Sequence, residues 1–390
     1  MAGRKVLLCL TGSAAIMRGP ELAREFIREG AEVRVVMSPS AAQLLSPTLM
    51  HWATGREVVT SLTGDLEHIK LSEWADAVVV APATASTLGK LAWGIADTPV
   101  TATVISSSGL GKPVFLAPAM HASMYLSGPV QDSVRKLAEK GFFLIGPVLL
   151  EGRAKMAEPR EIVLRVMFHR PQDLKGLRVA VTAGPTLEPI DRVKMITNLS
   201  SGKMGIAVAR MAALRGAEVV LIYGPGTEKP PEGVKVVRVR TTQEMKEALE
   251  REVREGVDLV VAAAAAQDLR VERPFERKLR SKETVELRLV PAPRVADGIK
   301  GISSRTLLVG FKAEYGVPEE ELVARAREKV EAGFDLVVAN DLSLAGAGFG
   351  EDTNEVVLVH RYGTERMKGR KEEVAHRLLD LALELKSRHP

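Results

Sequence analysis

Short runs of almost wholly apolar residues recur along the chain, separated by segments whose apolar residues repeat at helical spacing. Continuous apolar runs of this length are typical of parallel strands that are covered on both faces. The predicted strands of this kind are 77–80, 114–117 and 142–145, then 258–262, 306–309 and 335–339. The predicted helices between and after them are 130–140, 241–254, 319–332 and 371–387. This alternation predicts an α/β fold with a mostly parallel, doubly wound sheet.

The same opening pattern occurs twice. Residues 4–10 predict a strand, followed by a turn, a helix at 20–28 and a second strand at 31–37. A second opening begins with a strand at 177–181, and residues 215–222 repeat the pattern of residues 28–35. Proline and polar residues interrupt the pattern near residue 170. We therefore predict two three-layer, Rossmann-like domains, residues 1–170 and 171–390.

Composition narrows the class of protein. No apolar run approaches the ~18 residues of a membrane span and no signal peptide is evident, so we expect a cytoplasmic protein without a membrane partner. The single cysteine, Cys9, lies in the first strand and is read as a core residue; it excludes intrachain disulfides and cysteine-based metal clusters. The net charge of +5 is spread along the chain, which favours small anionic substrates over nucleic acid.

Neither half has the pattern of a dinucleotide-binding domain. The second strands end at Ser38 and Gly224 without the acidic residue that holds ribose hydroxyls, and neither opening contains the spaced glycines of that fold. A mononucleotide or a flavin phosphate therefore fits better than a nicotinamide cofactor.

Small hydroxylated residues follow three predicted strands of the first half. They are Gly12 and Ser13, Ser38, and Thr84 with Ser86. Hydroxyls and backbone N–H groups beside a helix N-terminus suit a phosphomonoester, although an ordinary strand-to-helix turn also explains each segment.

Two further segments of the first half carry candidate chemistry. His68 precedes an amphipathic stretch and is either structural or catalytic. In Pro118-Ala-Met120-His121-Ala-Ser-Met124-Tyr125, the methionines with His121 and Tyr125 either cover a flat aromatic ligand or pack in the core.

A polar insertion of roughly 20 residues separates the first strand of the second half from its helix, where such connections usually take two to six residues. Its end brings together Asn198, Ser200, Ser201 and Lys203. Hydroxyls, an ammonium and free helix N–H groups favour a phosphate, from either substrate or nucleotide; the alternative is a capped helix with a solvated lysine. Asn198 is placed to direct its amide at a reacting carbonyl.

Two later segments suit a nucleotide. Asp268 follows a strand that ends in small residues, as expected where a nucleotide lies on a sheet edge. The basic segment 277–282, which includes Lys278 and Lys282, suits a flap over a polyphosphate or an exposed cationic hairpin.

The motifs of the first half resemble those of the flavin-binding cysteine decarboxylase family. They include Thr11-Gly-Ser, His68-Ile-x-Leu, Ala81-Pro-Ala-Thr-Ala, Gly94-Ile-Ala-Asp, Pro118-Ala-Met with Met124-Tyr, and Met156-Ala-Glu-Pro. The resemblance implies an FMN that contacts Gly12, Ser13, Ser38, Thr84 and Ser86. It also implies that His68 is the catalytic histidine and that His121 and Met124 contact the substrate.

The motifs of the second half resemble a ligase. They are Thr182-Ala-Gly-x-Thr-x-Glu-Pro-Ile-Asp, Ile196-Thr-Asn-x-Ser-Ser-Gly-Lys-Met-Gly, Gly310-Phe311-x-Ala-Glu314, Val338-Ala-Asn-Asp and Phe349-x-x-Asp352-x-Asn354. Both halves together resemble the bifunctional phosphopantothenoylcysteine decarboxylase/phosphopantothenate–cysteine ligase family of coenzyme A synthesis. Its substrates are 4′-phosphopantothenate, cysteine and CTP, with Mg²⁺.

The ligase resemblance also implies roles for individual residues. Asn198 would act on the acyl-nucleotide, and Asp268, Lys278, Phe311 and Lys329 would bind nucleotide, with Asp268 near the metal. Lys278 would in addition neutralise charge on the leaving pyrophosphate. The resemblance implies a homo-oligomer, trimeric through the flavin half and dimeric through the ligase half.

Several departures from the family pattern leave alternatives open. His121 stands where the family has asparagine, and the loop 146–156 lacks the family's cysteine, so that Lys155, Tyr125 or His121 would have to donate the final proton. The segments at Lys278 and Arg294 also differ, which leaves ATP open beside CTP. A flavin-binding regulator joined to a ligase is the main alternative function; a flavin prenyltransferase-like first half would leave the ligase pattern unexplained.

Overall fold

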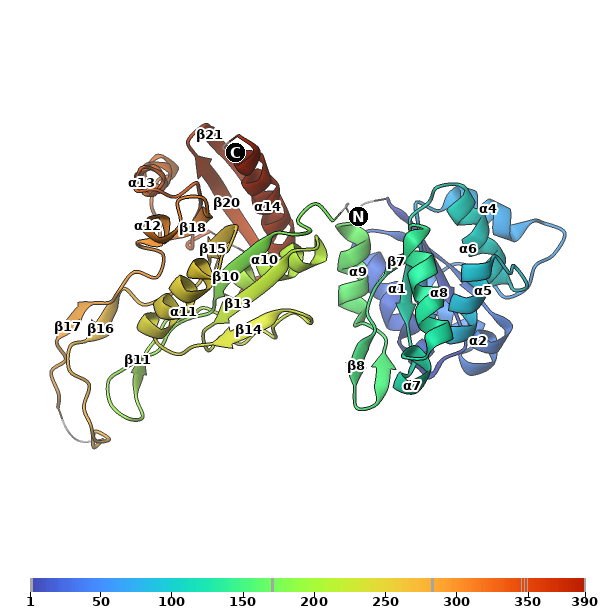
Figure 1. Ribbon diagram of the computed structural model, residues 1–390, viewed down its shortest axis with the longest axis horizontal. Coiled ribbons are helices and arrows are strands. Elements are labelled where there is room, and N and C mark those ends of the chain that lie inside the picture. Colours follow the sequence, from blue (N-terminus) through green and yellow to red (C-terminus); the bar gives the residue numbers. More distant parts are fainter. Residues whose placement is uncertain are drawn as a thin grey trace. The chain divides into compact units, whose positions relative to one another are not determined.

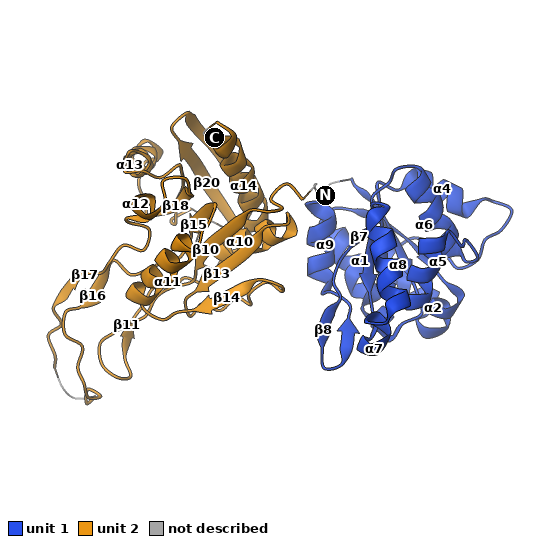
Figure 2. Ribbon diagram, in the orientation of Figure 1, with its two compact units in different colours: residues 1–169 blue, residues 170–390 orange. Residues whose placement is uncertain are grey.

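The structure is a computed structural model that describes residues 3–169, 172–281, 284–344, 346, 348 and 350–388. The chain forms two compact units, residues 1–169 and 170–390 (Figure 2). Each unit is built on its own sheet.

The first unit has a six-stranded, wholly parallel sheet. Its strands, in spatial order, are β3 (Val58–Val59), β2 (Glu32–Met37), β1 (Lys5–Leu10), β4 (Ala77–Ala83), β5 (Val114–Pro118) and β7 (Phe143–Leu144). The chain runs outward from β1 to β3 and then returns to the other side of β1 with β4. This reversal of direction opens a crevice at the carboxyl ends of β1 and β4, where ligands bind in open α/β sheets.

Helices cover both faces of this sheet (Figure 1). One core lies against α1 (Gly19–Arg28), α3 (Pro47–Thr54) and α9 (Pro159–Met167). The other lies against α4 (Glu67–Trp74), α5 (Ala85–Trp93), α6 (Pro99–Gly109) and α8 (Gly128–Glu139). Both cores exist because successive residues of each fully apolar strand point to opposite faces.

Shorter elements lie at the carboxyl edge of the first sheet. They are η1 (Ala14–Arg18), α2 (Pro39–Leu44), α7 (Ala122–Tyr125) and a small sheet of β6 (Met120–His121), β9 (Arg153–Lys155) and β8 (Val148–Leu150).

The second unit has an eight-stranded mixed sheet. Its spatial order is β14 (Lys235–Arg238), β13 (Glu218–Tyr223), β10 (Arg178–Ala183), β15 (Leu259–Ala262), β18 (Leu307–Glu314), β19 (Leu336–Asp341), β20 (Thr353–His360) and β21 (Gly363–Arg370). The first six strands are parallel and the last two are antiparallel. The predicted α/β fold with mostly parallel, doubly wound sheets is confirmed, but the sequence reading did not include the β20–β21 hairpin.

The helices of the second unit also lie on both sides of its sheet (Figure 1). They are α10 (Lys203–Leu214), α11 (Thr242–Arg254), α12 (Ile299–Ile302), α13 (Glu319–Glu331) and α14 (Lys371–Ser387). Helix α11 begins with the predicted capping box, in which Thr241 and Glu244 exchange side-chain to backbone hydrogen bonds. Helices α10 and α14 pack on each other, and the buried Arg215 at the end of α10 pairs with Asp173 and Asp380.

Two short antiparallel ladders extend from this unit on neighbouring arms (Figure 1). The polar insertion contains β11 (Glu188–Pro189) and β12 (Met195–Ile196), and the basic segment lies between β16 (Leu269–Val271) and β17 (Leu289–Pro291). The main chains of the arms are joined, because the Phe275 N–H donates to the Ile190 carbonyl at 2.8 Å.

The structure bears on two expectations from composition, the burial of Cys9 and the lack of a membrane-spanning segment. Cys9 is fully buried, as predicted, in the core of the first unit that lies against α4, α5, α6 and α8, and its burial raises the pKa of the thiol to about 12. Among the described residues, no helix combines the length and apolarity needed to cross a membrane.

Candidate functional sites

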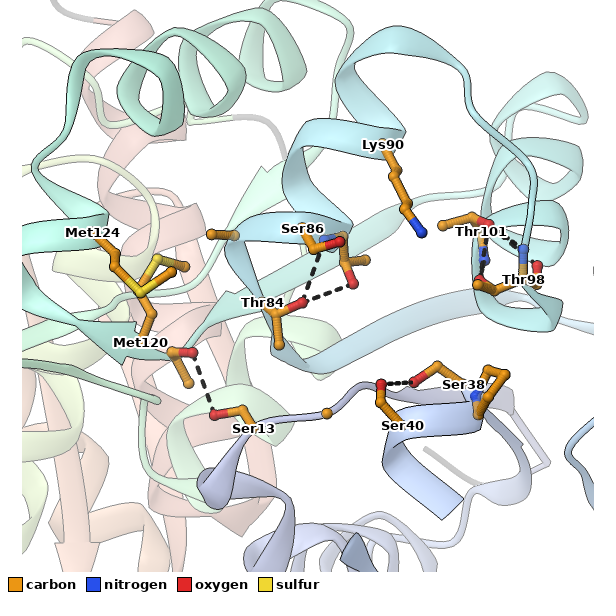
Figure 3. A pocket seen from close by; sticks show the side chains of 15 residues that line it. Ser13, Ser38, Ser40, Thr84, Ser86, Lys90, Thr98, Thr101, Met120 and Met124 are labelled. Carbon is orange, nitrogen blue, oxygen red and sulfur yellow. Dashed lines mark hydrogen bonds between the residues drawn. The ribbon is translucent and has the colours of Figure 1, made fainter. Parts of the chain in front are cut away.

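A pocket of about 540 Å³ lies at the carboxyl edge of the first sheet (Figure 3). All five residues predicted to contact the flavin line it, together with the predicted substrate residue Met124. The lining residues are Gly12, Ser13, Ser38, Pro39, Ser40, Thr84, Ala85, Ser86, Thr87, Lys90, Thr98, Thr101, Ala119, Met120 and Met124. Strands β1, β2, β4 and β5 end here, which is why residues far apart in the sequence meet.

The hydroxyl groups in this pocket mark the starts of helices. Ser38 Oγ accepts the Ala41 N–H at 3.2 Å at the start of α2, and Thr84 Oγ1 accepts the Thr87 N–H at 3.3 Å at the start of α5. Thr98 caps α6 with a capping box. The positive ends of several helix dipoles therefore converge on one space, which favours an anion.

Lys90 adds a full positive charge to this end of the pocket. Its side chain points into the pocket beside Ser86 and Thr101 (Figure 3), and its Nζ lies 2.7 Å from the Asp97 carboxylate. The hydrogen bond from Lys90 holds the pKa of Asp97 below its usual value. The sequence reading did not include Lys90, although it lies one and a half turns after Thr84 on the same helix.

The opposite end of the pocket is apolar, with Met120 and the half-exposed Met124 (Figure 3). Gly12 lets the turn after β1 lie close to Ser40, since a Cβ there would lie 2.5 Å from Ser40 Oγ. A cationic, hydroxyl-rich end and an apolar end fit a flat aromatic ligand that carries a phosphate, such as FMN.

The two predicted histidines do not line this pocket. His68 lies on α4, half buried, with a buried Nδ1 that has no hydrogen-bond partner among the described residues. His121 is exposed beside Met120, and its Nδ1 lies 2.8 Å from Ser123 Oγ at the start of α7. His121 thus caps α7, because its side chain accepts the Ser123 N–H. Lys155 pairs with Glu151 at 2.9 Å.

A second pocket, of about 960 Å³, lies at the carboxyl edge of the second sheet. Most of the predicted ligase residues line it: Asn198, Ser200, Ser201, Lys203, Asp268, Phe311 and Lys329. Lys278 does not line it, and Lys282 and Phe349 lie outside the described residues.

The start of helix α10 forms one wall of the second pocket. Gly202 is its N-cap residue, at φ +88°, and makes no side-chain cap hydrogen bond. Gly205 brings the helix against β10, where a Cβ would lie 2.4 Å from the Ala183 Cβ. Lys203 Nζ donates to the Asp352 carboxylate at 2.7 Å and to the Gly350 carbonyl at 2.6 Å.

The side-chain amide of Asn198 is held in place from two sides. Its Nδ2 donates to the Ala265 carbonyl at 2.6 Å, and its Oδ1 accepts the Ser200 N–H at 3.2 Å. The end of the insertion is thereby fixed to the loop that follows β15. An amide with a fixed direction beside a phosphate-suited helix start can act on a reacting carbonyl.

Cations line the rest of the second pocket. Lys329 Nζ donates to the Phe311 carbonyl at 3.0 Å; burial, and then the nearby charges of Lys312 and Arg294, lower the pKa of Lys329. Lys371, only 6% exposed, also borders the pocket beside Asn340 and Asn354. The sequence reading gave Lys371 no role. Several lysines and an arginine around one cavity suit a polyphosphate substrate.

Asp268 borders the second pocket but does not belong to a preformed metal centre. The described part of the chain contains no group of three or more histidine, cysteine or acidic side chains that could hold an ion. A magnesium ion bound through one carboxylate and substrate phosphates fits this donor set, because Mg²⁺ usually keeps waters and few protein ligands.

The fold and the pockets define a two-domain α/β protein in which each domain has a polar ligand site at its sheet edge. Residues 1–169 match the flavoprotein family model, and residues 174–385 match that of the DNA/pantothenate metabolism flavoprotein C-terminal domain. The first half is thus a flavoprotein domain.

Similar proteins span both halves. The coenzyme A biosynthesis bifunctional protein of Thermococcus kodakarensis is 45% identical over 97% of this chain and 95% of that protein. Those of Methanocaldococcus jannaschii and Bacillus subtilis are 36% and 35% identical, over 97% and 93% of this chain and 93% and 92% of those proteins. The chain belongs to the family of coenzyme A biosynthesis bifunctional proteins. The family and the bifunctional enzyme class predicted from the motifs are thereby confirmed.

Proposed function

We propose that the second half joins cysteine to 4′-phosphopantothenate at the expense of CTP, and that the first half then decarboxylates the product to 4′-phosphopantetheine with FMN. The observation that carries this proposal is the pair of pockets, one lined by all five predicted flavin residues and the other by Asn198 with the phosphate-suited start of α10. We assign residues 1–170 to the decarboxylase domain and 171–390 to the ligase domain.

In the ligation, the pantothenate carboxylate attacks the α-phosphate of CTP, and pyrophosphate leaves with Mg²⁺. The cysteine amine then attacks the activated carbonyl, and CMP leaves. Lys329 and Lys278 would offset the negative charge of the triphosphate, and Asp268 would bind the nucleotide and its Mg²⁺. The fixed amide of Asn198 donates to the carbonyl oxygen on which charge develops.

Ser200, Ser201 and Lys203 are assigned to the phosphate of 4′-phosphopantothenate. They are close to Asn198 in the chain, and the Ser200 N–H donates to Asn198 Oδ1, whereas Asp268, Phe311 and Lys329 come from other strand ends and loops. We infer that one substrate lies on each side of the reacting carbonyl.

In the decarboxylation, FMN would supply, when bound, the two-electron oxidation of the cysteinyl thiol that allows CO2 to leave, and the matching reduction afterwards. The chain binds the cofactor through Gly12, Ser13, Ser38, Thr84 and Ser86, with Lys90 at the phosphate end. Met124 covers the apolar end, and His121 contacts the substrate. We assign proton transfer to His68, whose buried Nδ1 has no partner among the described residues.

The second candidate function is a ligase whose flavin half is regulatory. The hairpin of β8 and β9 carries no cysteine, and His121 stands where an asparagine is expected. CTP is preferred over ATP by resemblance alone. We further propose a cytoplasmic homo-oligomer, with trimeric contacts through the flavin half and dimeric contacts through the ligase half.

The test is to incubate purified protein with phosphopantothenate, cysteine, Mg²⁺ and either CTP or ATP, and to follow product mass. Gain of cysteine followed by loss of CO2 supports both activities. Gain of cysteine alone selects the ligase with a regulatory flavin half. A colourless preparation that binds no added FMN would contradict the flavin assignment.

A further inference from the structure

The carboxylate of Asp191 links the polar insertion to the basic segment. Its side chain is buried, with the residue only 2% exposed, although both arms project from the sheet (Figure 1). Oδ1 accepts the N–H groups of Val193 and Lys194, each at 2.6 Å, within its own turn. Oδ2 instead accepts the N–H of Leu279, at 3.0 Å and 88 residues away, and an N–H of the Lys194 ammonium at 3.3 Å.

Further hydrogen bonds join the same two segments. The Phe275 N–H donates to the Ile190 carbonyl at 2.8 Å, and Arg192 Nε donates to the Glu276 carbonyl at 2.5 Å. Lys194 Nζ reaches the Leu279 carbonyl at 3.2 Å. Main-chain groups of residues 275–279 are therefore bonded to the turn 190–194 at several points.

The charge of Asp191 strengthens this link. The hydrogen bonds from Leu279 and Lys194 hold the pKa of Asp191 far below the usual carboxyl value, so the group stays ionised at any working pH. Hydrogen bonds to an ionised acceptor are stronger than those between neutral groups.

We propose that Asp191 is a positioning residue that fixes Lys278 relative to Asn198. Lys278 immediately precedes Leu279, whose main chain Asp191 holds at both its N–H and, through Lys194, its carbonyl. The insertion that carries Asp191 ends at Asn198 in the second pocket. Asp191 thereby joins the lysine assigned to the leaving pyrophosphate and the amide assigned to the carbonyl into one unit. This inference rests on the proposed function of Lys278.

The variant that isolates this link is Asp191→Asn. The amide keeps one oxygen for the turn N–H groups of Val193 and Lys194, but it sets an NH2 group against the Leu279 N–H. Glu272→Gln is the matched control, since Glu272 lies on the same arm and contacts Arg288 at 3.5 Å. If Asp191→Asn does not fold, Lys194→Met removes the ammonium bonds to the Asp191 carboxylate and the Leu279 carbonyl, while the N–H groups of Val193, Lys194 and Leu279 still donate to Asp191.

The first measurement is limited trypsin digestion of the full chain, with cleavage after Arg277, Lys278 and Arg280 followed by mass. Asp191→Asn should be cut there about tenfold faster or more, the usual effect of losing a hydrogen bond to a charged group. Glu272→Gln should be cut at the wild-type rate. Cleavage of Asp191→Asn at the wild-type rate would overturn the proposed link.

The second measurement separates the two half-reactions. Asp191→Asn should slow pyrophosphate release about tenfold and leave the reaction of cysteine with supplied acyl-cytidylate unchanged. The double variant Asp191→Asn with Lys278→Ala should release pyrophosphate no more slowly than Lys278→Ala alone, because both changes remove the contribution of the positioned Lys278 ammonium. Additive losses, or an equal slowing of both half-reactions, would overturn the positioning role.

The outcome also distinguishes this inference from the proposed function. If Lys278→Ala releases pyrophosphate normally, the role of Lys278 fails, and the positioning role fails with it. If Lys278→Ala is slow and Asp191→Asn is not, only the inference about Asp191 fails.

Discussion

The side-chain amide of Asn198 donates a hydrogen bond of 2.6 Å to the carbonyl of Ala265, across 67 residues of sequence. This bond joins the end of the polar insertion to the loop after β15. An aspartate at this position keeps the shape of the side chain but loses the donor, and it faces the Ala265 carbonyl with a negative charge.

Asn198→Asp should release pyrophosphate but form the amide product about 100-fold more slowly, the typical cost of losing one donor to a developing oxyanion. Mass spectrometry of the quenched reaction should then detect accumulated acyl-cytidylate. Thr197→Val is the control, since it removes the hydroxyl bonds to the main-chain carbonyls of Thr186 at 3.0 Å and Asn198 at 3.4 Å but leaves the Asn198 side chain intact. Equal slowing of both half-reactions would contradict this role for Asn198.

Lys90→Met should weaken FMN binding about tenfold or more, the size expected for a hydrogen bond to a charged group, and leave riboflavin binding unchanged. The reason is that riboflavin lacks the phosphate for which Lys90 supplies a charge. Titration by flavin fluorescence measures both affinities without catalysis. Lys140→Met is the control, because Lys140 Nζ donates to the Ala92 carbonyl away from the pocket. An equal loss of affinity for FMN and for riboflavin would indicate that Lys90 contacts the flavin ring and not the phosphate.

The nucleotide affinity should fall at alkaline pH as Lys329 loses its proton. Burial lowers the pKa of Lys329, so kcat/KM for the nucleotide should decline at a pH below the pKa of ~10.4 of an ordinary lysine. Lys329→Arg keeps the charge to much higher pH and should move this decline upward. A pH profile of kcat/KM tests the direction of this pKa shift, since the pH dependence of this ratio reports the pKa values of groups in the free enzyme. An unchanged profile in Lys329→Arg would exclude Lys329 as its source.

Gly205→Ala should lower the free energy of unfolding of the second unit by about 1–3 kcal/mol, as overpacking commonly does. The new Cβ would lie 2.4 Å from the Ala183 Cβ, so α10 must move away from β10 and carry Ser201 and Lys203 with it. We expect a raised KM for phosphopantothenate as well. Gly301→Ala is the control, because a Cβ there meets nothing within 4 Å. Denaturant unfolding measures the change; equal midpoints for both variants would refute the packing argument.

Several pocket residues could be predicted from the sequence because they directly follow buried strands. Ser13, Ser38 and Thr84 are of this kind in the first half, and Asp268 in the second. The carboxyl ends of neighbouring parallel strands meet at one edge, so their position follows from strand order in the chain. Asn198 could be proposed because the insertion is too long for a strand-to-helix turn.

Other residues of the pockets had no local signal. Lys90 and Lys371 lie on helices and reach their pockets because helical side chains lean toward the helix N-terminus. His68 and Lys278 were assigned roles by family resemblance, yet neither lines the pocket of its half. A motif marks a residue, but it does not specify the distance of that residue from another segment.

The sequence by itself determined the type and order of most helices and strands, the two repeated openings and the family. These features depend on local periodicity and residue type, which are read within short windows. Only the tertiary structure decided the spatial order of the strands, the antiparallel β20–β21 edge and the convergence of helix starts around Lys90. It alone showed the bonds from Asp191 to Leu279, because contacts between distant segments arise from packing of the whole unit.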